Sequence, residues 1–238
     1  MKCYSFVGDT CPYCRSTPIK YGKSQNKQRY YCKSCSKTWL TDYVNRACLP
    51  SVNSEIAAHI KEGCGIRSIA RLLHISAVTV ISRIQKIADS VEKPAIPTGR
   101  IYEVDELKTY VRKKTNDYWV IYALNRENRQ VVDFIAGKRN KKNLKRITDT
   151  LLLAGCKRIY TDGLKIYRLI IPERIHRVKR YGTNHIERKN LSLRMHLKRL
   201  GRKTICFSKS LRMLNACLKI YFWYKTIPVL GHTTLSSL

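Results

Sequence analysis

Acidic side chains are scarce in this sequence. Its 238 residues contain 16 Asp and Glu against 47 Lys and Arg, which gives a formal net charge of +31 at pH 7 and a pI near 10.0. A molecule with this charge repels other cations and attracts polyanions over long distances. The composition therefore predicts nucleic acid as the partner.

Long apolar runs are also missing. No segment approaches the ~18 consecutive apolar residues typical of a membrane-spanning helix, and the first residues show no secretory signal pattern. We therefore expect no membrane partner and a cytoplasmic, nucleoid-associated protein. In a reducing compartment, the ten cysteines are expected to bind metal or to be buried, rather than to form disulfides.

Four cysteines have the spacing of a zinc site. They form two Cys-x-x-Cys pairs with 17 residues between the pairs, namely Cys11, Cys14, Cys32 and Cys35. Four thiolates arranged tetrahedrally around Zn²⁺ leave no open coordination position, so the site is expected to be structural. Alternating residues at 19–21, 28–31 and 38–40 predict strands and hence a zinc ribbon over residues 1–48. A redox Cys-x-x-Cys pair or unrelated buried thiols are the alternatives.

Residues 49–90 have apolar side chains at helical spacing and predict three short helices. Ser76 is placed to cap the third helix. This segment resembles a helix-turn-helix, whose third helix enters the major groove of DNA. A small helical bundle that joins two domains is the alternative. The side chains predicted to contact DNA lie on the third helix, away from its apolar face. They are Thr79, Ser82, Arg83 and Lys86, and Arg83 is the best candidate.

A linker at residues 91–99, which contains Pro94 and Pro97, precedes the expected catalytic core at residues 100–230. The core pattern predicts three strands, a helix at 140–153 and a fourth strand at 158–161. This order is that of a ribonuclease-H-like α/β fold, in which the first and fourth strands are neighbours. Asp105 and Asp162 would then lie close together.

Carboxylates are fewest in the last 89 residues, where only Asp162, Glu173 and Glu187 follow Asp149. Glu187 lies in a predicted helix at 183–200, where Glu187, Asn190 and Arg194 share one face. Because hard divalent cations prefer oxygen ligands, we interpret Asp105, Asp162 and Glu187 as a metal site.

The assignment of the first acid is open on residue pattern alone. Strand alternation places Glu103 on the same face as Asp105 and Glu106 on the opposite face. We expect His185 to have a packing or phosphate-contact role rather than a catalytic one.

Basic residues surround the last of these acids. Residues 174–203 contain eleven Lys and Arg but a single acid, and such a segment is expected to bind DNA with an affinity that falls steeply with salt. The candidates for phosphate contacts are Arg177, Lys179, Arg180, Arg188, Lys189, Arg194, Lys198 and Arg199.

Four short sequences resemble the bacterial insertion-sequence-one family of DDE transposases. They are VDE at 104–106, TDGLKIY at 161–167, KRYGTNHIERKNLSLR at 179–194 and HLKRLGRKT at 196–204. The spacing of 24 residues between Asp162 and Glu187, and the basic Arg194 seven positions later, also match the family. The resemblance extends to about residue 225 and selects Asp105 as the first acid. No role is assigned to the tail at 231–238, which is expected to be flexible.

The resemblance implies an enzyme that binds the terminal inverted repeats of its element. Asp105, Asp162 and Glu187 would bind two Mg²⁺ or Mn²⁺ ions. Water would first cut the DNA to free a 3′-hydroxyl, which would then attack target DNA. DNA ends must be brought together, so a homo-oligomer on DNA is expected. The alternatives are a non-catalytic DNA-binding regulator derived from a transposase, or a nuclease that does not join ends.

Overall fold

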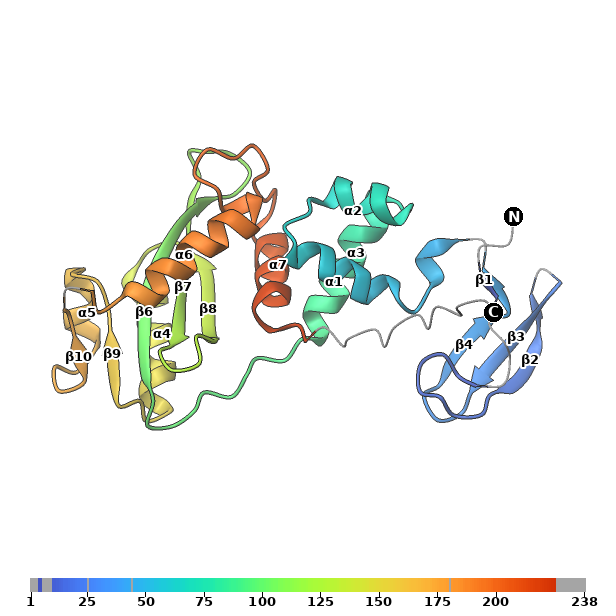
Figure 1. Ribbon diagram of the computed structural model, residues 1–238, viewed down its shortest axis with the longest axis horizontal. Coiled ribbons are helices and arrows are strands. Elements are labelled where there is room, and N and C mark those ends of the chain that lie inside the picture. Colours follow the sequence, from blue (N-terminus) through green and yellow to red (C-terminus); the bar gives the residue numbers. More distant parts are fainter. Residues whose placement is uncertain (1–3, 6–9, 25, 44, 180, 226–238) are drawn as a thin grey trace, which may run out of the picture. The chain divides into compact units, whose positions relative to one another are not determined.

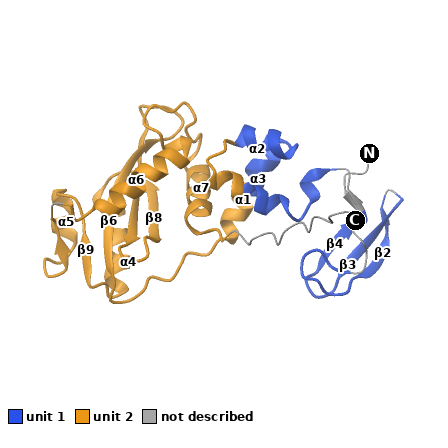
Figure 2. Cartoon of the chain, viewed as in Figure 1, with its two compact units in different colours: residues 1–56, 66–83 blue, residues 57–65, 84–238 orange. Residues whose placement is uncertain are grey.

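The computed structural model describes residues 4–5, 10–24, 26–43, 45–179 and 181–225. Arg180 and the predicted tail at 231–238 lie outside these residues. The chain divides into two compact units, one of residues 1–56 and 66–83 and the other of residues 57–65 and 84–238 (Figure 2).

The first unit begins with the small sheet that the sequence predicts. Its strands are antiparallel and lie in the order β2 (Ile19–Ser24), β3 (Lys27–Cys32) and β4 (Lys37–Leu40). A further antiparallel pair joins β1 (Tyr4–Ser5) to β5 (Asp42–Tyr43). Trp39 is buried in the small sheet and stacks on Tyr30 with 5.8 Å between the ring centroids.

Three helices follow a 3-10 turn at Arg46–Cys48, as predicted: α1 (Val52–Lys61), α2 (Ile66–Leu73) and α3 (Ala77–Ser90). The apolar positions that defined the periodicity are buried, among them Ile56, Ile69 and Val80. Ser76 caps α3 as predicted, because its Oγ accepts a hydrogen bond from the backbone N–H of Thr79 at 3.0 Å.

A five-stranded mixed sheet forms the centre of the second unit, in the order β10-β9-β6-β7-β8 (Figure 1). Strands β6, β7 and β8 are antiparallel, whereas β9 and β10 run parallel to β6. The predicted pairing of the first and fourth core strands is therefore confirmed, since β6 lies beside β9. The bounds are β6 (Ile101–Tyr110), β7 (Asp117–Asn125), β8 (Val131–Gly137), β9 (Arg158–Tyr160) and β10 (His176–Arg177).

Helices pack on both faces of this sheet (Figure 1). On one face, α4 (Lys141–Leu153) and α5 (Lys165–Ile170) bury a core with Tyr102 and Val104 of β6. On the other, α6 (Asn184–His196) and α7 (Leu211–Trp223) bury a core with Leu107 of β6 and Val120 of β7. Both faces are apolar because each is covered by helices.

Two details of the core differ from the predicted elements. The helix predicted at 183–200 ends at His196, because Leu197 is extended (φ −103°, ψ 92°) and a 3-10 turn, Lys198–Leu200, follows. Helix α5 and strand β10 were not predicted; each is too short for its periodicity to be visible in sequence.

Within the residues that the structure describes, no helix is both long and apolar enough to span a membrane.

The cap of α4 provides a test of the core's local stability. The Asn140 side chain accepts a hydrogen bond from the backbone N–H of Asn143 at 2.9 Å. We expect Asn140→Ala to lower the free energy of unfolding by ~1 kcal/mol, because one of the first amides of α4 loses its acceptor. Chemical denaturation followed by circular dichroism measures the change. Lys142→Ala, in the exposed first turn of the same helix, is the control, and equal losses in the two variants would contradict the capping role.

Candidate functional site

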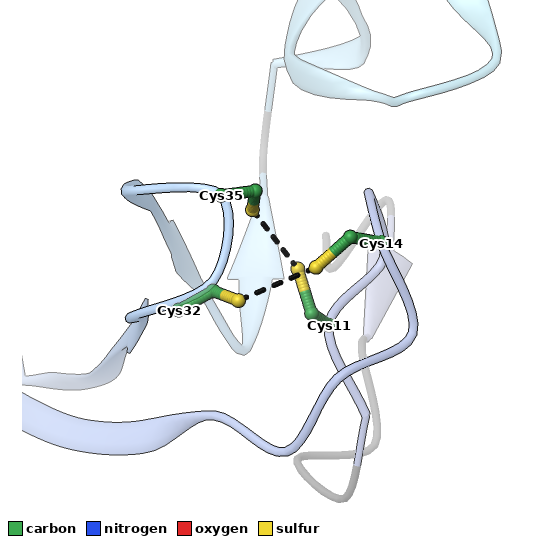
Figure 3. A group of neighbouring side chains, drawn as sticks. All are labelled: Cys11, Cys14, Cys32 and Cys35. Carbon is green, nitrogen blue, oxygen red and sulfur yellow. Dashed lines mark hydrogen bonds between the residues drawn. The ribbon is translucent and has the colours of Figure 1, made fainter.

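The four paired cysteines converge on one point in the first unit (Figure 3). The Sγ atoms of Cys11 and Cys35 are 3.7 Å apart, and those of Cys14 and Cys32 are 3.4 Å apart. All four sulfur atoms lie within 4.8 Å of one another. Tetrahedral zinc with Zn–S bonds of ~2.3 Å requires sulfur atoms about 3.8 Å apart. The donor set therefore fits a structural zinc ion.

Each cysteine pair is held in a matching turn. Arg15 and Ser36, which directly follow the second cysteine of each pair, have left-handed backbones with φ of 64° and 54°. The backbone N–H of Tyr13 donates to the Cys11 Sγ at 3.4 Å. In the part of the ribbon that the structure describes, the buried residues of this cluster are Cys11, Cys32 and Trp39. So small an apolar core cannot stabilise the ribbon by itself, and metal binding is expected to supply the remainder.

A group of carboxylates lies where β9 ends beside β6. The last paired residues of these parallel strands are Glu103 and Tyr160. Asp105 follows Glu103 by two residues, and Asp162 follows Tyr160 by two residues just after β9 ends, so the two acids are level with each other. Together with Glu106, they present carboxylate oxygens that all lie within 4.8 Å of one another. The predicted proximity of Asp105 and Asp162 is thus present in the structure.

Asp105 is held by two hydrogen bonds. Its Oδ1 accepts from the Glu106 backbone N–H, and its Oδ2 accepts from the Asn190 Nδ2, both at 2.7 Å. Burial raises the pKa of the Asp105 carboxyl from 3.8 to about 6, and the negative charges of Glu106 and Asp162 add to the rise. The two hydrogen bonds oppose the rise. Asp162 Oδ1 accepts from the Leu164 backbone N–H at 3.1 Å, which fixes the turn after β9.

Glu106 is the member of this group that the sequence reasoning did not select. It is 8% exposed. It accepts a hydrogen bond from the Tyr167 hydroxyl and forms an ion pair with Arg139 at 3.0 Å. Burial raises the pKa of the Glu106 carboxyl, and Tyr167 and Arg139 oppose the rise. Strand alternation placed Glu106 on the opposite face from Asp105. However, among the described residues the pairing of β6 with β9 ends at Glu103, so side chains of either face of β6 can turn towards Asp162 beyond that point.

Glu187 does not join this group of carboxylates in the part of the chain that the structure describes. It is exposed in the first turn of α6, where the Thr183 hydroxyl donates to its Oε1 at 2.7 Å. Asn190, which binds Asp105, follows Glu187 by three residues on the same helix, and residues at this spacing are neighbours on a helix surface. His185 contacts the buried carboxylate of Glu103 at 2.5 Å, which agrees with the expected packing role.

Four of the arginines predicted to contact DNA also have partners within the protein, namely Arg83, Arg177, Arg194 and Arg199. Arg83 donates to the Ala47 carbonyl at 3.0 Å and to Asn53 Oδ1 at 3.4 Å. Arg194 donates to the Leu200 carbonyl at 2.8 Å.

Other predicted contact residues lie on α3, on α6 and in the 3-10 turn after α6. The Thr79 hydroxyl shares a hydrogen bond with Ser76. The exposed side chains are Ser82, Lys86, Arg188 and Lys198.

The zinc site predicts a metal-dependent ribbon. We expect Cys32→Ala to remove the bound zinc and to make residues 10–41 sensitive to limited proteolysis, because a buried ligand is lost from a small core. Metal analysis and mass spectrometry of the fragments measure both effects. Cys48→Ala, at an exposed cysteine outside the cluster, is the control. Retention of zinc by Cys32→Ala would contradict the assignment.

The carboxylate group predicts a pH-dependent stability. Because the pKa of Asp105 is raised to about 6 in the folded protein, its proton stabilises the native state at low pH. This stabilisation is lost as the pH rises from about 4 through 6. In buffer without added Mg²⁺ or Mn²⁺, Asp105→Asn should therefore be more stable than the parent at pH 7.5, and the difference should shrink towards pH 5.

Thermal unfolding across this pH range measures the effect. Asp149→Asn controls for the loss of a surface carboxylate paired with Lys145. A constant difference between Asp105→Asn and the parent at all pH values would contradict the raised pKa of Asp105.

Comparison with solved structures gives low overall similarity. The simian T-cell lymphotropic virus intasome in complex with PP2A regulatory subunit B56 gamma has a chain that aligns with a TM-score of 0.37 at 13% identity, over 68% of this chain and 66% of that one. The HTLV-2 integrase catalytic core domain in complex with magnesium aligns with a TM-score of 0.36 at 13% identity, over 54% of this chain and 86% of that one. No conclusion about this chain follows from similarity at this level.

Sequence comparison is more informative. Insertion element IS1 protein InsB of Shigella flexneri is 38% identical over 119 residues, which are 50% of this chain and 91% of that protein. Insertion element IS1 4 protein InsB of Escherichia coli (strain K12) is 35% identical over 119 residues, which are 50% of this chain and 71% of that protein. The family model for the IS1 transposase matches residues 100–226, which contain the whole carboxylate group and α6. The chain belongs to the IS1 transposase family.

Proposed function

We propose that this protein is a DNA transposase that binds the ends of its element and performs metal-dependent strand cleavage and strand transfer. One observation carries the proposal: Asp105 and Asp162, which are far apart in sequence, present carboxylate oxygens within 4.8 Å of each other inside the domain that matches the family.

Asp105 and Asp162 would hold divalent cations, with Glu187 as the third ligand from α6. Their donor atoms are all carboxylate oxygens, which suits Mg²⁺ or Mn²⁺ rather than softer metals. Two such ions supply positive charge next to the attacking and leaving oxygens of a phosphodiester. The Thr183 hydroxyl donates to the Oε1 of the exposed Glu187 side chain, so Glu187 would bind the cation through its other carboxylate oxygen.

Protein side chains around the acids keep this arrangement in place. Asn190 orients Asp105, and the turn at Leu164 orients Asp162. Arg139 and Tyr167 hold Glu106, so that Glu106 adds negative charge at the site without moving. Arg188 and Lys198 are exposed on and just after α6, where they are available for DNA phosphates.

DNA recognition is assigned to α2 and α3, which would act as a helix-turn-helix, and to the zinc ribbon. Because Arg83 donates to Ala47 and Asn53, we assign direct DNA contact to the exposed Ser82 and Lys86 and a supporting role to Arg83. Two element ends must be joined to one target, so the active form is a homo-oligomer on DNA. A net charge of +31 makes binding steeply dependent on salt.

Substitution of one acid tests the proposed chemistry. We expect Asp162→Asn to lower Mg²⁺-dependent cleavage and joining of a DNA end by at least about 10³-fold, since a metal ligand worth several kcal/mol in the transition state is lost. Binding to the same DNA should change little. Gel assays of cleavage, joining and mobility shift measure the three steps separately. Glu173→Gln, an exposed acid outside the carboxylate group, is the control.

The products distinguish the competing functions. Joined DNA products from the parent protein support a transposase, whereas cleavage without joined products indicates a nuclease. Binding without any cleavage by the parent indicates a non-catalytic regulator. Full activity of Asp162→Asn would remove the carboxylate group from the mechanism.

A further inference from the structure

Glu103 is a fully buried acid outside the carboxylate group. Its side chain has 0% exposure, and it is two residues from Asp105 on the same face of β6. Two groups donate to it: the Ile186 backbone N–H to Oε2 at 2.9 Å and the His185 Nδ1 to Oε1 at 2.5 Å. The Arg126 guanidinium forms an ion pair with Oε1 at 3.3 Å. Both donors belong to the first turn of α6.

Helix α6 has no cap of its own. Its N-cap residue, Thr183, makes no side-chain hydrogen bond to the amides of the first turn. The Thr183 hydroxyl donates to Glu187 Oε1 instead, at 2.7 Å. The first amides of a helix have no partner within the helix, and Glu103 accepts from one of them, that of Ile186. A carboxylate at this end of a helix is also favoured by the helix dipole.

A second connection joins the middle of α6 to the sheet. The Tyr122 hydroxyl donates to Asn190 Oδ1 at 2.9 Å and to the Ile186 carbonyl at 3.1 Å. Tyr122 is the cross-strand partner of Asp105. Because the Asn190 oxygen faces Tyr122, the Asn190 amide nitrogen faces Asp105 and donates to it. Glu187 lies between the two attachment points of α6, which are Ile186 and Asn190.

Burial of Glu103 has no advantage for stability alone. An ionised carboxylate removed from water loses several kcal/mol of hydration, and apolar side chains of similar volume often replace buried ion pairs without loss of stability. Two of the groups that offset that cost, His185 and Ile186, belong to α6, so Glu103 is fully compensated only when α6 is docked. Glu103 therefore ties the position of α6 to β6.

We propose that Glu103 is a positioning residue for the metal site. Glu103 takes the place of the missing N-cap of α6, so the Thr183 hydroxyl remains available to hold Glu187. Glu103 also fixes α6 against β6, so that Glu187 can reach a cation bound by Asp105 and Asp162. This role rests on the proposed function. Glu103 itself would not touch the metal or the DNA.

The test compares Glu103→Gln and Glu103→Ala in the full-length protein without DNA. Glutamine keeps an acceptor for the Ile186 N–H, whereas alanine removes it. We expect Mn²⁺ binding to weaken by about 10- to 100-fold in Glu103→Ala, as for other residues that orient metal ligands, and less in Glu103→Gln. Titration of free Mn²⁺ by electron paramagnetic resonance measures the affinity.

Hydrogen exchange gives a readout that does not depend on metal. In Glu103→Ala, peptides that cover residues 184–190 should exchange faster, while those of α4 on the opposite face should not change. Thr183→Val provides a second variant, because it removes the hydrogen bond to Glu187 and keeps the Glu103 cap. It should weaken Mn²⁺ binding without faster exchange in α6. Ser192→Ala, whose hydroxyl donates only to the Arg188 carbonyl of the same helix, should match the parent in both measurements.

The outcomes separate this inference from the proposed function. If the parent protein neither binds Mn²⁺ nor cuts DNA, the proposed function fails. If the parent does both, but Glu103→Ala and Thr183→Val bind Mn²⁺ within about twofold of it, only the positioning role is overturned. Failure of both Glu103 variants to fold would assign Glu103 to stability and would likewise overturn the proposal. Recovery of cleavage by Glu103→Gln at high Mn²⁺ concentration would support it.

Discussion

The parallel pairing of β6 with β9 is the constraint on which the carboxylate group depends. Backbone hydrogen bonds fix the register of Glu103 with Tyr160, and a shift of one residue would turn Asp162 to the other face. With this register, Asp105 and Asp162 lie level just beyond the end of β9. The cores on the two faces of the sheet, under α4 and α5 and under α6 and α7, maintain the register. Two acids that are 57 residues apart in the chain, at positions 105 and 162, meet as a result.

The negative charges of the carboxylate group need positively charged groups or hydrogen-bond donors close to them. Three carboxylates have oxygens within 4.8 Å of one another. Burial raises the pKa of Asp105 to about 6, and the negative charges of Glu106 and Asp162 add to the rise. Arg139 and Tyr167 compensate Glu106, whereas the donors to Asp105 among the described residues are neutral, namely the Asn190 amide and the Glu106 backbone N–H. Without a cation, the negative charge at Asp105 and Asp162 is therefore the least compensated in the group. A divalent ion is the partner that would relieve this repulsion most directly.

Structural features that depend on neighbouring residues could be predicted from the sequence. Features that depend on where a helix or strand ends could not. The cysteine pairs, the cap at Ser76 and the strand β6 each depend on neighbours in sequence, and the structure contains all three. The inclusion of Glu106 depends on where β9 stops, which sequence patterns define poorly. The early end of α6 depends on Leu197, and the contacts of Arg83 depend on the packing of Ala47 and Asn53. A basic side chain on a helix surface does not reveal from sequence whether its partner is DNA or a nearby carbonyl.

The acids of the site differ in how they are held, and this difference bears on how the site forms. Asp105 and Glu106 belong to a central strand and Asp162 follows its neighbour, so they are in place once the sheet forms. Glu187 belongs to a helix without its own cap, which is attached to the sheet through the side chains of Glu103, Tyr122 and Asn190. In the proposed metal site, docking of this helix, rather than formation of the sheet, would therefore determine whether Glu187 is available as the third acid. Because Asn190 binds Asp105 itself, the position of the helix and the orientation of Asp105 are coupled through one amide.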